Sequence, residues 1–143
     1  ASGVAVGERM TRCRAMTPDK ATPDIASIAQ TWLRGTLAKD DAVIDSVIDP
    51  DIKVWHNTDK VEQSITQNRK GTAWLYGKVP DLDMVDVRQN VFDGGWVQQH
   101  RMVGTRSDGS ALEILSCIIF TVSSAGRITR MEEYIDPSQV GKL

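Results

Sequence analysis

The sequence predicts an α+β domain in which a curled antiparallel sheet packs on three N-terminal helices around one internal apolar pocket. Apolar residues recur at helical spacing before Pro80 and alternate with a period of two after it. Short glycine-containing turns separate the later strands, which favours antiparallel neighbours. A chain with helices first and a sheet afterwards has the order of an α+β domain.

Each helix has a start or stop signal in the sequence. Thr22 is a candidate N-cap with Pro23 at the first helical position. The second helix stops at Asp49-Pro50, because proline lacks an amide hydrogen and disfavours helix in the residue before it. Gly77 and Pro80 end the third helix. The expected helices are therefore 22–37, 41–48 and 61–76.

The strands show alternating apolar and polar residues between turn signals. A curled sheet that helices close on its concave side leaves a cavity, where a ligand would bind. Residues 1–20 lack periodicity, so we expect a disordered or loosely docked arm, followed by a single domain at 21–143. The expected strands are Ile52–Asn57, Leu82–Val91, Trp96–Thr105, Ala111–Val122 and Ile128–Asp136.

Composition narrows the classes of partner. The net charge of −2 argues against nucleic acid, whose phosphates require a basic face. The longest apolar stretch, Ile114–Val122, is too short to span a bilayer, so no membrane partner is expected. Cys13 falls in the polar arm and Cys117 in an apolar strand, so two separate thiols and a reducing cytoplasmic location are expected.

His100 and Asp136 are the candidate catalytic residues. His100 lies in the middle of a strand, between apolar and aromatic neighbours, where an imidazole needs a partner. Asp136 ends the last strand and could orient the ring and stabilise its cation. Such a pair can act as a general base near neutral pH. His56 is a weaker candidate, and a structural role for His100 stays open.

Other residues are candidates for binding the substrate. Asn57, Gln98 and Tyr134 can donate hydrogen bonds to an oxygen atom. Only one of the adjacent Glu132 and Glu133 can point inward, since neighbours on a strand face opposite sides. The full set expected around the substrate is Trp55, Asn57, Trp96, Gln98, Met102, Glu132 and Tyr134.

Several familiar sites are absent from the sequence. It contains no glycine-rich phosphate loop, no dinucleotide fingerprint and no Gly-x-Ser-x-Gly element. No His and Cys residues have zinc spacing. We therefore expect cofactor-free acid–base chemistry, without a metal.

Two short motifs are similar to a known family. The segment Val-Trp-His-Asn at 54–57 and the terminal strand Ile-Thr-Arg-Met-Glu-Glu-Tyr-Ile-Asp-Pro at 128–137, in this order of helices and strands, resemble the SnoaL-like branch of the nuclear transport factor 2-like superfamily. The resemblance implies a cone-shaped fold with an internal pocket. SnoaL-type cyclases use a base Asp on the penultimate strand, where Cys117 or Ile118 lies here. Scytalone dehydratase and related lyases use a His–Asp pair, to which His100 and Asp136 are similar.

The pocket layout resembles that of limonene epoxide hydrolase. Under that resemblance Asn57 and Asp136 match the Asn and the last Asp of the family. Trp55 takes the place of a Tyr, Gln98 that of an Arg and His100 that of an Asp. The Asp-Arg-Asp relay of that family is therefore not kept.

Three functions remain open at this point. The favoured one is a lyase, dehydratase or isomerase that abstracts a proton from an apolar or aromatic small molecule. An epoxide hydrolase, or a non-catalytic ligand-binding or dimerisation module, are the alternatives. We also expect a homodimer formed through the convex face of the sheet, where Val97, Val103 and Ile118 would otherwise expose an apolar surface.

Overall fold

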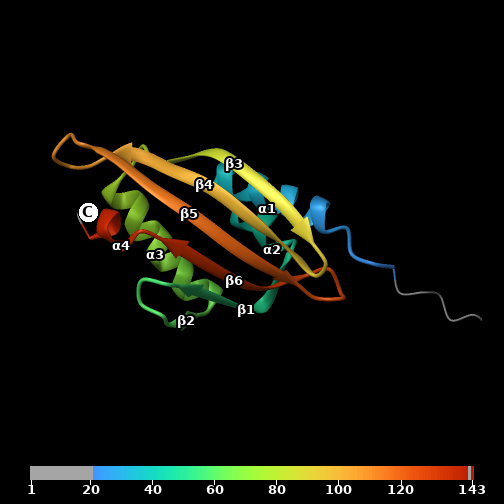
Figure 1. Ribbon diagram of the computed structural model, residues 1–143. Helices are drawn as coiled ribbons and strands as arrows, with labels where there is room; N and C mark the ends of the chain where they lie inside the picture. Colours follow the sequence, from blue (N-terminus) through green and yellow to red (C-terminus); the bar gives the residue numbers. More distant parts are fainter. Residues whose placement is uncertain (1–20, 142) are drawn as a thin grey trace, which may run out of the picture.

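The computed structural model describes residues 21–141 and 143, and the predicted arm at 1–20 lies outside them. The described residues form one six-stranded sheet with helices packed against it (Figure 1). The helices are α1 (Ile25–Ala38), α2 (Asp41–Asp45), α3 (Ile65–Lys78) and α4 (Pro137–Val140). The strands are β1 (Ile48–His56), β2 (Glu62–Gln63), β3 (Asp83–Phe92), β4 (Gly95–Thr105), β5 (Ala111–Val122) and β6 (Ile128–Ile135).

Helices α1 and α3 begin later than the sequence predicted, because other polar residues cap them, whereas α2 begins at Asp41 as predicted and ends earlier, at Asp45. Asp24, and not Thr22, caps α1 by accepting a hydrogen bond from the Ser27 amide. At α3 the side chain of Ser64 accepts from the Gln67 amide, while the Gln67 side chain accepts from the Ser64 amide. This capping box starts α3 at Ile65. The preceding residues, predicted as helix, pair with β1 as β2 instead.

The sheet has the strand order β2-β1-β6-β5-β4-β3. Strands β3 to β6 form the predicted antiparallel meander. However, β1 lies parallel to β6, so the sheet is mixed and not wholly antiparallel. β1 is also longer than predicted, and Pro50 lies within an irregularity of its pairing between Ile48 and Lys53. Proline is tolerated there because an irregular position does not need its amide hydrogen.

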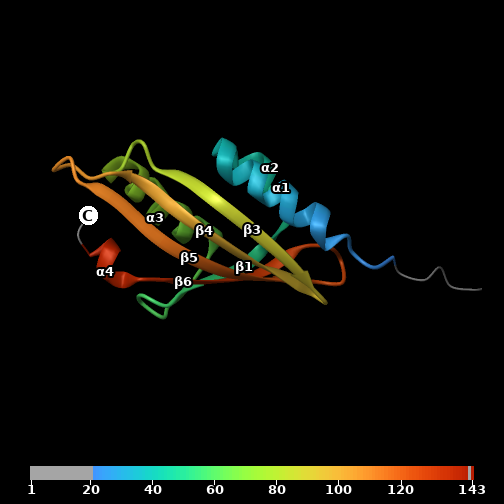
Figure 2. The same ribbon diagram turned by 45° about the horizontal axis from the view of Figure 1, so that its top comes forward.

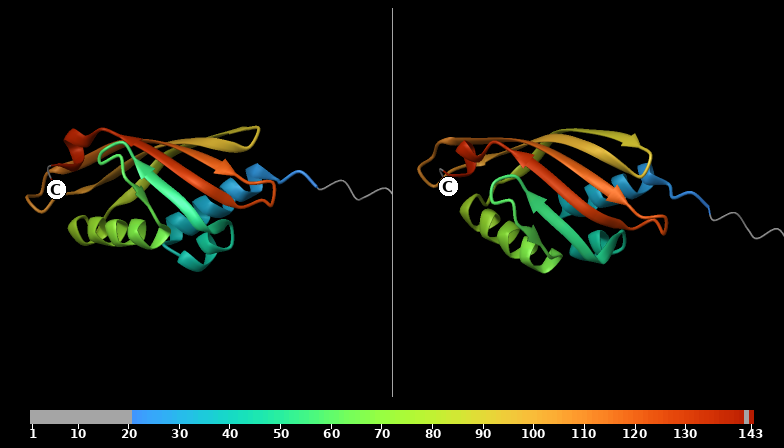
Figure 3. Two further views of the ribbon diagram at one scale, coloured as in Figure 1. Left: turned by 90° about the horizontal axis from the view of Figure 1, so that it is seen from below. Right: turned by 60° about the horizontal axis from the view of Figure 1, so that its bottom comes forward.

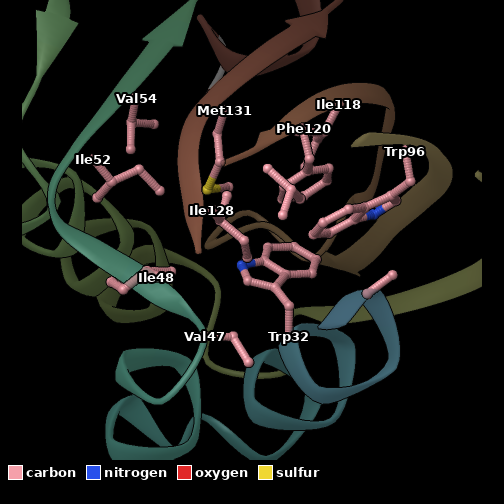
Figure 4. Close-up of a cluster of buried hydrophobic side chains, with 12 residues drawn as sticks. Trp32, Val47, Ile48, Ile52, Val54, Trp96, Ile118, Phe120, Ile128 and Met131 are labelled. Carbon is pink, nitrogen blue, oxygen red and sulfur yellow. The ribbon is translucent and has the colours of Figure 1, made fainter. Parts of the chain in front are cut away.

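Helices α1, α2 and α3 lie on one side of the sheet (Figures 2 and 3). α1 and α2 lie together near one end of the sheet, and α3 covers the other end. Beneath α1 and α2 the aromatic side chains pack closely (Figure 4). The ring of Phe120 stacks on Trp96 with centroids 3.9 Å apart and meets Trp32 edge-on at 4.7 Å. This cluster is the main core of the protein.

Alternation along β4 and β5 decides which residues face the helices. Trp96, Gln98 and His100 are buried on the concave face, which leaves Val97 and Val103 on the convex one. Ile118, which was expected on the convex face, is only 4% exposed and belongs to the core. Its neighbour Leu115 is the exposed apolar residue of that strand. The homodimer stays a prediction.

Candidate active site

A cavity of about 300 Å³ lies between α3 and the concave face of the sheet. None of the residues within Ile65–Lys78 is buried, so α3 stands over this space and does not fill it. The cavity continues toward α1 at Trp32 and Thr36. Its apolar wall includes Trp32, Leu75, Met84, Met102, Ile114, Ile118 and Met131.

Polar side chains interrupt this apolar wall on four neighbouring strands. His56 follows the inward-facing Val54 of β1, and Glu133 follows Met131 of β6. The parallel pairing of β1 and β6 places His56 directly opposite Glu133. On the next two strands Ser116 and His100 are direct partners. The sheet register thus gathers two imidazoles, a hydroxyl and a carboxylate in one row.

Glu133 is the centre of this polar row. Its Oε2 atom lies 3.0 Å from Nε2 of His56, and its Oε1 atom accepts a hydrogen bond of 2.6 Å from the Ser116 hydroxyl. Burial alone would raise the pKa of Glu133, but the hydrogen bonds from His56 and Ser116, with the charges of the two imidazoles, hold that pKa below its ordinary value. Glu133 is therefore a carboxylate at neutral pH.

The two histidines respond in opposite directions. The hydrogen bond to Glu133 raises the pKa of His56 above 6.5, although burial opposes it, and the charges of Glu133 and Asp59 add to the rise. His100 has no carboxylate hydrogen bond; burial lowers its pKa below 6.5, and the charge of Glu133 offsets this only in part. The cavity wall thus holds one imidazole that readily takes a proton and one that stays neutral.

His100 is 4% exposed and is held from one side. Its Nδ1 atom lies 3.2 Å from Nε2 of Gln98, two residues earlier on the same face of β4. Its Nε2 atom is buried and has no hydrogen-bond partner among the residues that the structure describes. His100 lines the cavity, and a buried nitrogen without a partner is the exception that needs an explanation.

The residues predicted from the sequence fall into separate places. His100 and Met102 line the cavity. Gln98 lies behind His100, and Trp96 is part of the aromatic core. Asn57 joins β1 to β6, because its amide group exchanges two hydrogen bonds of 3.0 Å with the backbone of Ile135.

Four predicted residues lie at the other face of the sheet or at its end, namely Trp55, Glu132, Tyr134 and Asp136. Tyr134 is 45% exposed and contacts Trp55, with ring centroids 5.4 Å apart. Glu132 pairs with Arg130 at 3.1 Å, so Glu133 is the inward member of the two glutamates. Asp136 accepts a hydrogen bond from the Ser138 amide and caps α4. The carboxylate whose charge acts on His100 is Glu133.

A larger hollow of about 760 Å³ lies on the convex face. Leu115, Cys117 and Tyr134 line it together with the charged Asp86 and Arg101. The Arg101 guanidinium pairs with Asp86 at 2.7 Å and with Glu113 at 2.9 Å, so these charges satisfy one another at the surface. The concave cavity, smaller but apolar and lined by His56, His100 and Glu133, is the better candidate for chemistry.

Three polar residues of the cavity site leave a signal in the sequence, although His56 was only a weak candidate, Glu132 was chosen over Glu133, and Ser116 was not a candidate. Each is the polar member of an alternating apolar row on one strand face. The rows are Ile52-Val54-His56, Ile114-Ser116-Ile118 and Met131-Glu133-Ile135. A polar residue in such a row must face the core, where it needs a partner.

Two further findings concern metal binding and membrane crossing. Within the described part of the chain, no group of three or more His, Cys, Asp or Glu side chains could hold a metal ion. Among residues 21–141 and 143, no helix is long and apolar enough to cross a bilayer.

No protein-family model matches the sequence, and no curated protein does. Solved structures do match the fold. IdmH from Streptomyces antibioticus, a candidate polyketide cyclase, is 12% identical, with a TM-score of 0.72 over 83% of this chain and 96% of that one. A candidate SnoaL-like polyketide cyclase from Jannaschia sp. CCS1 is 21% identical, with a TM-score of 0.69 over 85% and 94% of the two chains.

Two other solved structures are also similar to this chain. TerC, crystallised with polyporic acid, is 16% identical, with a TM-score of 0.70 over 82% of this chain and 95% of that one. An NTF2-like protein of unknown function from Burkholderia pseudomallei is 10% identical, with a TM-score of 0.69 over 82% and 95% of the chains. The resemblance inferred from the sequence is confirmed at the level of the fold: the chain has the fold of these SnoaL-like and NTF2-like structures.

Proposed function

We propose that this protein is a cofactor-independent acid–base enzyme, a lyase, dehydratase or isomerase, that abstracts a proton from an apolar or aromatic small molecule. The observation that carries the proposal is the contact of 3.0 Å between Glu133 and His56 in the wall of a largely apolar cavity. Removing ionisable groups from water is costly, so a partly buried pair beside an open cavity favours a catalytic role over a structural one.

The pair has the parts of a general base. Glu133 accepts the hydrogen on Nε2 of His56, which fixes the ring and leaves Nδ1 to take a proton from the substrate. The carboxylate then stabilises the imidazolium that forms. Ser116 holds the second oxygen of Glu133 at 2.6 Å and so restricts its rotation.

The similar structures support this reaction class at a coarse level. IdmH and the Jannaschia protein are candidate polyketide cyclases. Polyketides are rich in carbonyl groups, and closing a carbon ring on one requires removal of a proton beside a carbonyl. The cavity here could serve a cyclisation of this kind or a simpler elimination or isomerisation.

Deuterium exchange into 2-tetralone, an aromatic ketone with acidic protons beside its carbonyl, tests the proposal. In D₂O the protein should accelerate loss of those proton signals in the NMR spectrum. Glu133→Gln and His56→Gln should each lower the exchange rate by about 10²–10⁴-fold, the usual contribution of a positioned base. Glu113→Gln is the matched control, since that carboxylate pairs with Arg101 at the protein surface.

Binding of 2-tetralone in the cavity with exchange at the buffer rate would contradict the proposal. That result would instead support the non-catalytic ligand-binding alternative. Hydrolysis of limonene 1,2-epoxide without exchange into the ketone would support the epoxide hydrolase alternative.

A further inference from the structure

A chain of side-chain amides connects α1 to His100 through the interior. The Gln89 amide nitrogen donates to the backbone carbonyl of Ala29 at 3.2 Å and to Oε1 of Gln98 at 2.9 Å. The Gln98 amide nitrogen in turn lies 3.2 Å from Nδ1 of His100 and 3.6 Å from the sulfur of Met84. Gln98 is completely buried, so its amide makes these hydrogen bonds away from solvent.

The direction of this chain is fixed at Ala29, because a backbone carbonyl can only accept a hydrogen bond. Gln89 must present its NH₂ group there, and its own oxygen accepts from Gln30 at 2.9 Å. The second N–H of Gln89 then points at Gln98, whose oxygen must accept it. The NH₂ group of Gln98 is therefore the one that faces His100.

We propose that this relay holds His100 as a neutral imidazole with its proton on Nε2, and that this N–H donates a hydrogen bond to a carbonyl oxygen of the substrate. A ring nitrogen that accepts a hydrogen bond carries no proton, so the proton of a neutral His100 is on the other nitrogen. Gln89 and Gln98 are positioning residues. This donor role takes the place of the general-base role predicted for His100.

Burial of the ring and the lack of a hydrogen-bond partner for Nε2 among the described residues both support the donor role. A buried donor without a partner is unfavourable, and a hydrogen bond to a ligand oxygen would relieve that cost. The desolvation that lowers the pKa of His100 also disfavours the imidazolium form.

The substrate part of this inference rests on the proposed function. His56 removes a proton beside the carbonyl, the C–H electrons form a carbon–carbon double bond, and the carbonyl π electrons move onto oxygen. The N–H of His100 stabilises the resulting enolate oxygen, as preorganised donors do at developing charges. The step needs no oxidant or reductant. The substrate class is therefore an apolar or aromatic carbonyl compound.

Nitrogen NMR of the ligand-free protein tests the relay independently of any activity. The sequence has only two histidines, so [¹⁵N]histidine labelling gives two imidazole spectra, and those that persist in His56→Gln belong to His100. We expect the wild-type His100 to be neutral with a protonated Nε2 and a bare Nδ1. Gln98→Met should turn this single tautomer into a mixture.

Gln89→Met is the more informative variant. Gln89 is only partly buried, and it contacts His100 only through Gln98. It should also yield a tautomer mixture, since the Gln98 amide can then turn over. Gln99→Met is the matched control: it lies next to Gln98 but is exposed on the other face. A proton on Nδ1 in the wild type, or an unchanged His100 in both relay variants, would overturn the relay.

The carbonyl assignment is tested with 2-tetralone and with tetralin, which has the same rings without the oxygen. The ketone should shift the Nε2–H resonance of His100 and bind about tenfold more tightly, the effect of one hydrogen bond. Tetralin should leave that resonance in place. Equal affinity for the two compounds, including no measurable binding of either, would overturn the carbonyl assignment and leave the relay as measured in the free protein.

Discussion

The two ends of the concave sheet face differ in how closely the covering helices pack against them. Under α1 and α2, Trp32 packs edge-on against Phe120, which stacks on Trp96, and these rings belong to the main core. Under α3 the facing residues include Asn68, Gly71 and Thr72, and a cavity remains. The same alternating strands thus supply a core at one end and a lined cavity at the other. The apolar content of the covering helix decides which of the two forms.

The inward-facing ionisable groups follow the same division. The aromatic end is held by burial of apolar surface, whereas His56, Glu133 and His100 line the cavity end. His56 and Glu133 can persist in the cavity wall because each satisfies the other. Stability and chemistry are therefore expected to depend on different ends of the sheet.

The largest expected effect is on stability at the aromatic end. Phe120→Ala should lower the free energy of unfolding by about 3–5 kcal/mol, because it opens a void between the rings of Trp32 and Trp96. Leu75→Ala, in α3, should cost about 1 kcal/mol or less, since Leu75 already borders a cavity. Urea unfolding measures both changes. Equal losses would remove the distinction between the two ends.

The pH dependence of turnover tests the role of His56 at the cavity end. A base must be deprotonated to act, and the hydrogen bond from Glu133 raises the pKa of His56 above 6.5. The rate should therefore fall about tenfold per pH unit below a midpoint that lies above 6.5. In Glu133→Gln the residual rate should show a lower midpoint, because an amide does not stabilise the imidazolium. A midpoint below 6.5 in the wild type would assign the titration to another group.

The fold could be predicted because its signals are local. The switch to alternation at Pro80 located the long strands, and β5 was predicted with its observed bounds. The parallel pairing of β1 with β6 could not be predicted, because it joins segments far apart in the sequence. The N-terminus of α3 was placed too early because the Ser64–Gln67 capping box was not recognised.

The site was harder to predict, because its geometry depends on register between strands. His100 lies buried in the cavity wall, and the sequence suggested Asp136 as its partner because Asp136 ends the last strand. The pairing of β1 with β6 instead brings Glu133 to His56. Alternation alone could have shown that Glu133 faces inward, between Met131 and Ile135. It could not have shown which side chain lies opposite.

Two helical glycines offer a smaller test of the difference in packing. A Cβ atom added at Gly71 of α3 would meet no atom within 4 Å, so Gly71→Ala should raise the free energy of unfolding by about 0.5–1 kcal/mol. A Cβ atom at Gly35 of α1 would lie 2.8 Å from Cγ1 of Ile44. Gly35→Ala should therefore give no such gain. Thermal unfolding of the two variants provides the comparison, and a larger gain at Gly35 would contradict it.

The smallest expected effect concerns the ion pairs that hold α3, a helix in which no residue is fully buried. Arg69 of α3 lies 2.7 Å from Asp45 and 3.3 Å from Asp41, the two ends of α2. These pairs are partly exposed, so Arg69→Met should cost only about 0.2–1 kcal/mol of global stability. The local stability of α3 should fall by more than the global stability, because these contacts hold α3 to α2 at the aromatic end of the molecule.

Hydrogen exchange can separate the local effect from the global one. Amides of α3 should exchange faster than those of α1 in the wild type, since α3 buries no residue, and faster still in Arg69→Met. Lys70→Met removes the same charge from the exposed next position and should leave both helices unchanged. Ion pairs between exposed groups weaken as salt screens them, so 1 M NaCl should bring the wild type close to Arg69→Met. Equal protection of α1 and α3 would mean that contacts other than these ion pairs hold α3 against the sheet.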